Sequence, residues 1–156
     1  MPVPHEKENN MNVLSLQSIF FARHAQHVVL IHFPIALCLA GVLFDIAAVW
    51  TGRREFATVA FWNLAFAALS AIPAAITGAL AWQLELEGCR LKGVLLFHLI
   101  FAAASVTLIW AVFLSHLRHM RRPGSARYRW ALEALGVLAI TVTGYLGGIL
   151  SGVNHG

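Results

Sequence analysis

Residues 28–50 read VVLIHFPIALCLAGVLFDIAAVW, an almost unbroken apolar run that holds a single acidic side chain. An α-helix rises about 1.5 Å per residue, so about 20 apolar residues are enough to cross the roughly 30 Å of hydrocarbon in a bilayer. The run is therefore long enough to predict a membrane-spanning helix.

Three further apolar runs follow, at 57–82, 93–117 and 130–152, and short polar segments separate them. The chain of 156 residues is 59% hydrophobic and only 12% charged, which is about half the charged share of a typical soluble domain. Backbone polar groups in lipid must be bonded within each segment, so the runs are expected to be helices. The sequence predicts an all-α fold, an integral membrane four-helix up-down bundle formed by residues 27–156.

The first 26 residues form a more polar N-terminal tail ahead of this domain. Within it, residues 12–22 read NVLSLQSIFFA and are amphipathic, which is typical of a helix lying in the membrane interface. A loosely ordered tail is the alternative. The tail lacks a basic start, an apolar stretch and a small-residue cleavage site, so we do not expect a cleavable signal.

Positive charge is distributed unevenly between the two predicted sides of the membrane. Seven of the 11 Lys and Arg residues lie on the side of the first and third loops, at Arg53, Arg54, Arg118, Arg121, Arg122, Arg127 and Arg129. Four lie on the side of both termini, at Lys7, Arg23, Arg90 and Lys92. Because cytoplasmic loops are enriched in Lys and Arg, we expect a bacterial inner-membrane protein with both termini in the periplasm. These arginines lie at membrane ends and form no nucleic-acid-binding patch.

Two of the eight histidines lie clearly inside apolar runs. His32 is four residues past Val28 and His98 is five past Gly93, so each is about 6–8 Å inside the periplasmic end of its helix. The first and third helices run in the same direction in an up-down bundle and stand diagonally opposite each other. We therefore expect the two imidazoles at one depth, facing each other across the interior.

The second and fourth helices carry glycines at the same depth, namely Gly78, Gly144, Gly147 and Gly148. Missing side chains there would leave room for a flat ring system. Two facing histidines and this space predict one haem b with His32 and His98 as axial ligands, since bundle interiors are used for such cofactors. Arg23, Arg90 and Lys92 lie on the same side and are candidate partners of the haem propionates.

Other interpretations of these residues remain open. His27 and His155 are alternative ligands on the same side, but His27 and His32 point in different directions from one helix. Histidines within a membrane can instead hydrogen-bond neighbouring helices, and the glycine ridge at Gly144, Gly148 and Gly152 is typical of close helix contact. A zinc site is disfavoured because further ligands at fixed spacing are missing. Neither of the two cysteines begins a CxxCH motif, which excludes covalent haem attachment.

The remaining polar residues of interest lie toward the cytoplasmic end. Asp45 is the acid deepest within a run, and we expect it to hydrogen-bond Asn63 of the second helix or to pair with Arg53 or Arg54. The structural role is favoured over a proton path because no relay of acids continues outward. His116 and His119 are expected to join the basic loop that follows them.

The motifs H27-x4-H32-F-P-I-A-L and G144-Y-L-G-G-x-L, with Asp45 and the histidine of the third helix between them, resemble the bacterial membrane family called domain of unknown function 2231. The resemblance covers residues 24–153. Val28 and Ala102 depart from the residues often found at their positions in that family. The resemblance implies a small membrane protein and favours haem-based electron transfer.

Together these observations predict a cytochrome b-like electron-transfer subunit that is not an enzyme by itself. It would relay electrons between a periplasmic redox partner and quinone or a larger membrane complex, because two axial histidines favour electron transfer over oxygen chemistry. The alternative is a cofactor-free structural accessory subunit. A transporter is disfavoured because four helices without inverted repeats offer a poor transport path.

Overall fold

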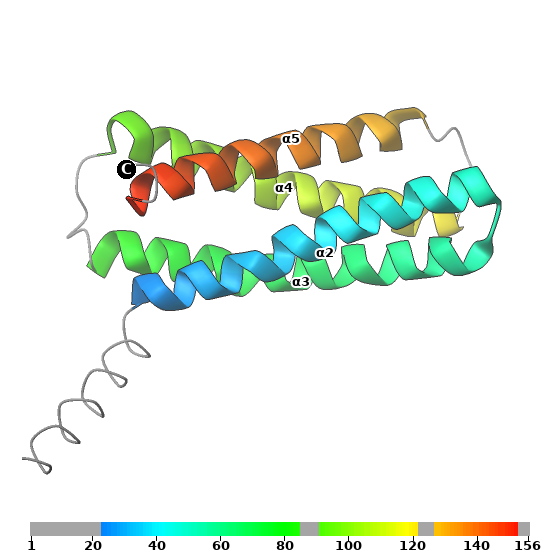
Figure 1. Ribbon diagram of the computed structural model, residues 1–156, viewed down its shortest axis with the longest axis horizontal. Coiled ribbons are helices and arrows are strands. Elements are labelled where there is room, and N and C mark those ends of the chain that lie inside the picture. Colours follow the sequence, from blue (N-terminus) through cyan, green and yellow to red (C-terminus); the bar gives the residue numbers. More distant parts are fainter. Residues whose placement is uncertain (1–22, 85–90, 122–126, 153–156) are drawn as a thin grey trace, which may run out of the picture.

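The computed structural model describes residues 23–84, 91–121 and 127–152, and these form four long helices. They are α2 (Arg23–Thr51), α3 (Arg54–Leu84), α4 (Gly93–Arg121) and α5 (Arg127–Leu150). Figure 1 shows them lying side by side with alternating direction. The predicted all-α membrane bundle is confirmed, and each helix is long and apolar enough to cross a bilayer.

The helices extend past the predicted apolar runs by a few residues at most of their ends. The helix α2 already begins at Arg23, so it includes residues 23–26 of the predicted N-terminal tail. Residues 1–22, with the predicted interfacial helix, lie outside the described part of the chain. Polar residues continue a helix readily once the apolar segment has nucleated it, and hydropathy alone does not mark where such a helix ends.

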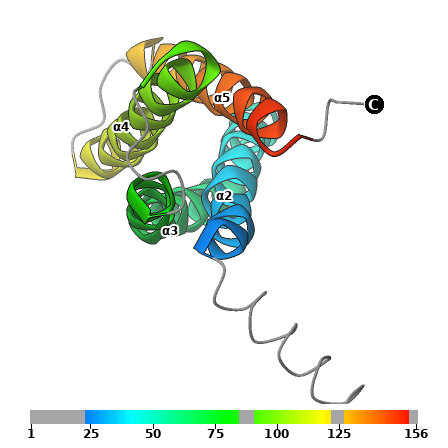
Figure 2. The same ribbon diagram turned by 90° about the vertical axis from the view of Figure 1, so that its left-hand side faces the viewer.

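The four helices form a ring in chain order, so that α2 and α4 occupy opposite corners (Figure 2). Contacts are most extensive between α2 and α3 and between α4 and α5, while α2 and α5 touch little. The bundle is thus two helical hairpins that pack mainly through α3 and α4. The diagonal placement of the first and third helices agrees with the sequence prediction.

Small residues allow α2 and α3 to approach closely. A Cβ atom added to Gly41 would lie 2.7 Å from Cγ of Leu64, which is fully buried. The core around this contact is formed by Cys38, Leu64, Ala67, Ala68, Ala71, Ile109, Val112 and Ile140. The alanines on α3 allow the neighbouring helices to approach closely. Dispersion contacts between closely packed side chains stabilise this core, because lipid provides no hydrophobic driving force for helix association.

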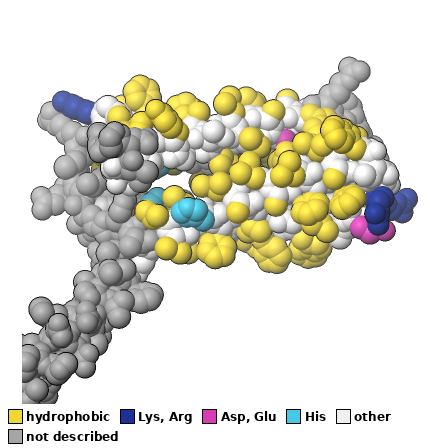
Figure 3. All heavy atoms as spheres, viewed as in Figure 1, with side chains coloured by type: hydrophobic (Ala, Val, Ile, Leu, Met, Phe, Trp, Pro, Cys, Tyr) yellow, Lys and Arg dark blue, Asp and Glu magenta, His cyan; other side chains and the backbone are white. Residues whose placement is uncertain are grey.

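Large hydrophobic side chains cover the outer surface, as expected for helices in contact with lipid. Trp50, Trp62, Leu43 and Tyr145 are all more than half exposed. Figure 3 shows hydrophobic side chains over most of the described surface on one face, with Lys and Arg at its two ends. The polar side chains of the helices gather in two groups, one at each end of the bundle, and only the second is fully buried.

Candidate functional site

The first group of polar side chains lies at the end of the bundle where α2 begins, and it contains His27, His32 and His98. His27 Nδ1 donates a hydrogen bond to the carbonyl oxygen of Ala74 on α3, at 3.1 Å, and lies 3.3 Å from the Thr77 hydroxyl. These bonds tie α2 to α3. His27 is thus an interhelical hydrogen-bonding residue.

His98 makes the corresponding connection between the other two helices. Its Nδ1 donates to the carbonyl oxygen of Thr143 on α5, at 3.2 Å. Nearby, the hydroxyls of Ser105 and Thr143 are 2.9 Å apart. His98 shares its face of α4 with buried Ser105 and Ile109, so the ring lies on the side of the helix that packs against α5.

His32 differs from the predicted inward orientation. Its side chain is exposed, and its Nδ1 donates to the carbonyl oxygen of Val28 on its own helix, at 2.6 Å. On α2 it shares a face with exposed Leu39 and Leu43, whereas the buried face carries Cys38 and Asp45. The structure therefore places His32 on the outer side of α2 and not across the interior from His98.

The predicted glycines divide into two kinds. A Cβ atom on Gly78 would lie 2.8 Å from Cε1 of His27, and one on Gly147 would lie 3.3 Å from Cε1 of His98. Gly144 and Gly148 have open space beside them. The structure thus brings glycine and histidine together in pairs, and at Gly78 and Gly147 the imidazole itself lies in the space that the sequence prediction assigned to a porphyrin edge.

Several predicted site residues lie where their side chains are not described. Arg23 is the first residue of α2, but its side chain is not among those that the structure describes. Arg90 and His155 lie wholly outside the described residues. Lys92 is exposed just before α4. The predicted propionate partners and the alternative ligand His155 therefore remain predictions.

The second group of polar side chains is a buried charged cluster at the opposite end, formed by Asp45, His116, Arg129 and Glu133. A terminal guanidinium nitrogen of Arg129 donates to Asp45 Oδ2 at 2.9 Å, and His116 Nε2 donates to Glu133 Oε1 at 2.7 Å. Arg129 Nε also lies 3.7 Å from Glu133 Oε1. All four residues are less than 9% exposed, so three helices share a charged network inside the membrane domain.

The structure corrects the predicted partners of Asp45. Asn63 instead donates to the carbonyl oxygen of Val59 on its own helix, and Arg53 lies 3.7 Å from exposed Glu55. Asp45 does bond between helices, as predicted, but its partner is Arg129 on α5. A buried guanidinium satisfies a buried carboxylate more fully than a side-chain amide would.

The prediction for His116 is wrong, because this residue turns into the bundle and bonds Glu133. His119, one turn on, is half-buried. Glu133 and Arg129 were missed because they stand at the start of the last apolar run, where charges resemble those of a loop. Their spacing of four residues on one helix was the available signal, since residues four apart lie on the same face.

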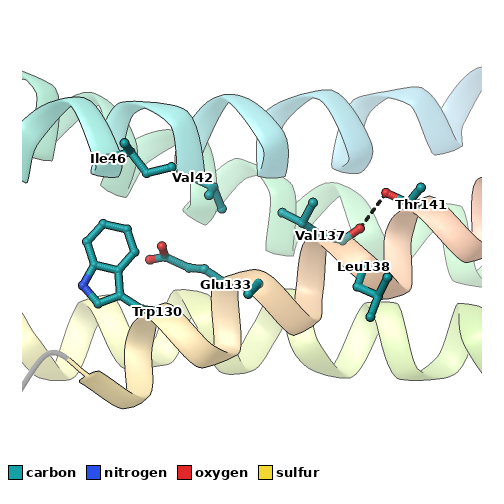
Figure 4. A pocket seen from close by; sticks show the side chains of 8 residues that line it. Val42, Ile46, Trp130, Glu133, Val137, Leu138 and Thr141 are labelled. Atoms are coloured by element: carbon teal, nitrogen blue, oxygen red, sulfur yellow. Dashed lines mark hydrogen bonds between the residues drawn. The ribbon is translucent and has the colours of Figure 1, made fainter.

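An open groove of about 430 Å³ runs between α2 and α5, beside the charged cluster. Glu133 is the one acidic residue lining it, and Figure 4 shows its carboxylate extending from α5 toward α2. Oε2 of this carboxylate is buried and has no hydrogen-bond donor among the described residues. The walls are formed by Val42, Ile46, Trp130, Ala134, Val137, Leu138 and Thr141.

The cluster has the residue types of a metal site, and its geometry can be compared with one. Asp45, His116 and Glu133 each offer a ligand atom, and these atoms lie within 4.8 Å of one another. A tetrahedral zinc ion with bonds near 2.0–2.2 Å needs ligand atoms only about 3.4 Å apart. The Arg129 guanidinium already supplies the positive charge, so the arrangement fits an ion-pair network better than a metal centre.

Comparison with known proteins agrees with this description of a small helical membrane domain. The model of a family described as "Predicted membrane protein (DUF2231)" matches residues 23–155, which is most of the chain. No curated protein and no solved structure matches it. The match spans all four helices and includes both groups of polar side chains. The chain therefore belongs to the membrane protein family called domain of unknown function 2231.

Proposed function

We propose that this protein is an electron-transfer subunit of the bacterial inner membrane, holding one haem b near its periplasmic end and passing electrons between a periplasmic redox partner and quinone or a larger membrane complex. One observation carries the proposal. His32 and His98 both direct Nδ1 at a backbone carbonyl oxygen. A carbonyl only accepts, so in the neutral ring Nδ1 carries the proton and Nε2 keeps its lone pair.

This is the arrangement in which histidine ligates a metal, because the second ring nitrogen of a ligating histidine is commonly anchored to a carbonyl or carboxylate. No described residue hydrogen-bonds Nε2 of His32 or His98. Haem b would supply a one-electron redox centre. The chain's own residues would fix the tautomer and the orientation of each imidazole.

The two histidines do not fit this role equally. His98 is half-buried between helices, and its bond to the Thr143 carbonyl oxygen gives the tautomer that a ligating histidine needs. His32 faces outward, so the pair does not enclose a porphyrin between α2 and α4 in this arrangement. We therefore assign the first ligand to His98 and leave His32 and His27 as competing candidates for the second.

The second candidate function is a cofactor-free accessory subunit that packs against a larger membrane complex. It is favoured by the bonds of His27 and His98 to neighbouring helices and by the fit of each ring against a glycine. In this function the histidines stabilise the helix pairs, and no electron passes through the protein.

An absorption spectrum of the purified full chain, produced in haem-replete cells, separates the two functions. We expect the sharp bands of a low-spin haem after reduction, their loss in His98→Ala, and no change in His119→Ala, a matched histidine on the same helix. Of His32→Ala and His27→Ala, the variant that converts the iron to high spin identifies the second ligand. Purification without haem in every preparation would overturn electron transfer and leave the accessory subunit.

A further inference from the structure

Among the described residues that line the groove between α2 and α5, the Glu133 carboxylate contributes a buried oxygen that has no hydrogen-bond partner. The side chain of Glu133 is 2% exposed, and its Oε1 accepts a hydrogen bond from His116 Nε2 at 2.7 Å, while Arg129 Nε lies 3.7 Å away and is itself without a hydrogen-bond partner among the described residues. Oε2 has no partner among the described residues. Of the other polar side chains in the lining, the Thr141 hydroxyl already donates to the carbonyl oxygen of Val137, and the Trp130 indole can only donate. The groove therefore lacks one hydrogen-bond donor.

A buried acceptor without a donor is unfavourable and is normally satisfied by a ligand or an ordered water. The charges around Glu133 restrict which ligand can do so. An anion is repelled by the carboxylate itself. A cation is disfavoured because the Arg129 guanidinium lies beside the same carboxylate and a full charge would have to leave water for an apolar groove. The ligand that remains is a neutral molecule that donates a hydrogen bond from a hydroxyl group.

The shape and surroundings of the groove define the rest of the ligand. Its volume of about 430 Å³ is within the range of roughly 300–1,000 Å³ that small-molecule sites occupy. Apolar side chains from both helices form most of the wall, and the indole of Trp130 lies beside the Glu133 carboxylate (Figure 4). Because the groove is open along an apolar surface, a ligand can enter from lipid and leave a long tail there.

We infer that this groove binds a lipid-soluble hydroquinone, with the aromatic ring against Trp130 and one hydroxyl group donating to Glu133 Oε2. The inference gives a binding site to the quinone partner of the proposed function and in that sense rests on it. It does not require haem, because every contact that supports it belongs to the groove and the charged cluster.

The acceptor-only character of a carboxylate makes the site sensitive to the oxidation state of its ligand. A hydroquinone hydroxyl donates to Glu133, whereas a quinone oxygen can only accept and would face a second acceptor. Hydrogen bonds to charged groups are among the stronger ones in proteins, so we expect the reduced form to bind about tenfold to 100-fold more tightly.

The test uses the full chain in phosphatidylcholine nanodiscs and anaerobic calorimetry with a short-tailed benzoquinol and its oxidised quinone. Glu133→Gln should bring the ratio of the two Kd values close to one, because an amide both donates and accepts. Ala134→Phe fills the groove and should weaken both forms equally. Ala131→Phe adds the same side chain at an exposed position of α5 outside the groove and should leave both Kd values unchanged.

Four results would overturn the inference. Equal affinity of the wild type for both forms would show that the carboxylate does not select a donor. Binding that survives Ala134→Phe would place the ligand elsewhere or in the lipid. The absence of binding, or tighter binding of a long-chain aliphatic alcohol than of the quinol, would show that Oε2 takes only water or a simple hydroxyl group. Haem content is not measured here, so failure of this test is distinct from failure of the absorption test.

Discussion

Arg129 on α5 donates a hydrogen bond of 2.9 Å to Asp45 on α2, although 84 residues separate them in the chain. The bond joins the two helices that have the fewest other contacts among neighbours in the ring. It therefore closes the bundle on the side where packing contributes least. A buried charge that loses its partner is costly, so each residue depends on the other.

Asp45→Ala should strongly destabilise the protein. It leaves the Arg129 guanidinium buried without its carboxylate, and such a change typically lowers the free energy of unfolding by about 3–5 kcal/mol. The midpoint of unfolding in a detergent titration measures the effect. Glu55→Ala, which removes the acid of an exposed ion pair, is the control and should change the free energy of unfolding by less than about 1 kcal/mol.

The double variant Asp45→Ala with Arg129→Met should recover a large part of the lost stability. Methionine replaces the charge with an apolar side chain of similar length, so no unpaired cation stays in the bundle, and Glu133 keeps its hydrogen bond from His116. A double variant as unstable as Asp45→Ala alone would show that the loss comes from packing around Asp45 and not from the ion pair.

Gly41 should tolerate no larger residue, because its Cβ position is already occupied by the Leu64 side chain at 2.7 Å. We expect Gly41→Val to lower the free energy of unfolding by about 1–3 kcal/mol, since overpacking forces α2 and α3 apart. Gly136→Ala is the matched control, because the nearest atom to its added Cβ is at an ordinary distance of 3.8 Å. Similar losses in both variants would contradict close packing at Gly41.

The glycines near the histidines should differ in how they respond to a larger side chain. Gly147→Leu should displace the His98 ring and break its bond to Thr143, whereas Gly144→Leu places its side chain in open space. The nitrogen-15 spectrum of the imidazole measures the change, because loss of the carbonyl acceptor alters the Nδ1 environment. Equal spectra in the two variants would show that Gly147 does not position His98.

Cysteine labelling tests which end of the bundle faces the cytoplasm. In a Cys89→Ser background, Lys92→Cys should react in intact spheroplasts with a maleimide that cannot cross the membrane, and Glu55→Cys should react only after lysis. The native Cys38 is buried and is expected to stay unreacted. The opposite pattern would place both termini in the cytoplasm and move the histidine group to that side.

The sequence was sufficient to predict the four helices because each is a long apolar run, and membrane helices are recognised by that feature alone. The predicted level of His98 and Gly147 agrees with their contact, whereas Gly78 contacts His27, five residues before the predicted ligand His32. The sequence did not show which way each helix is rotated. His32 and His27 are only five residues apart, and their roles depend on where α3 packs against α2.

The charged cluster was beyond prediction for a related reason. Asp45, His116 and Glu133 come from three helices, and each lies about 7–9 Å inside its helix end, but equal depth does not show that their helix faces meet. The sequence analysis counts Arg129 with the third loop, because charges that flank an apolar run usually lie at the membrane boundary, and it assigns no role to Glu133. The contact between α2 and α5 closes the ring of helices, and no local pattern specifies it.

The separation of Asp45 from Arg129 also has a consequence for biosynthesis. Translation and membrane insertion proceed from the N-terminus, so the hairpin of α2 and α3 is made before any of α5 exists. During that interval Asp45 carries the full desolvation penalty of an acid in the membrane without a cation. A nascent chain that stops short of α5 therefore keeps Asp45 without its guanidinium partner, and only the finished chain can form the ion pair that closes the ring of helices.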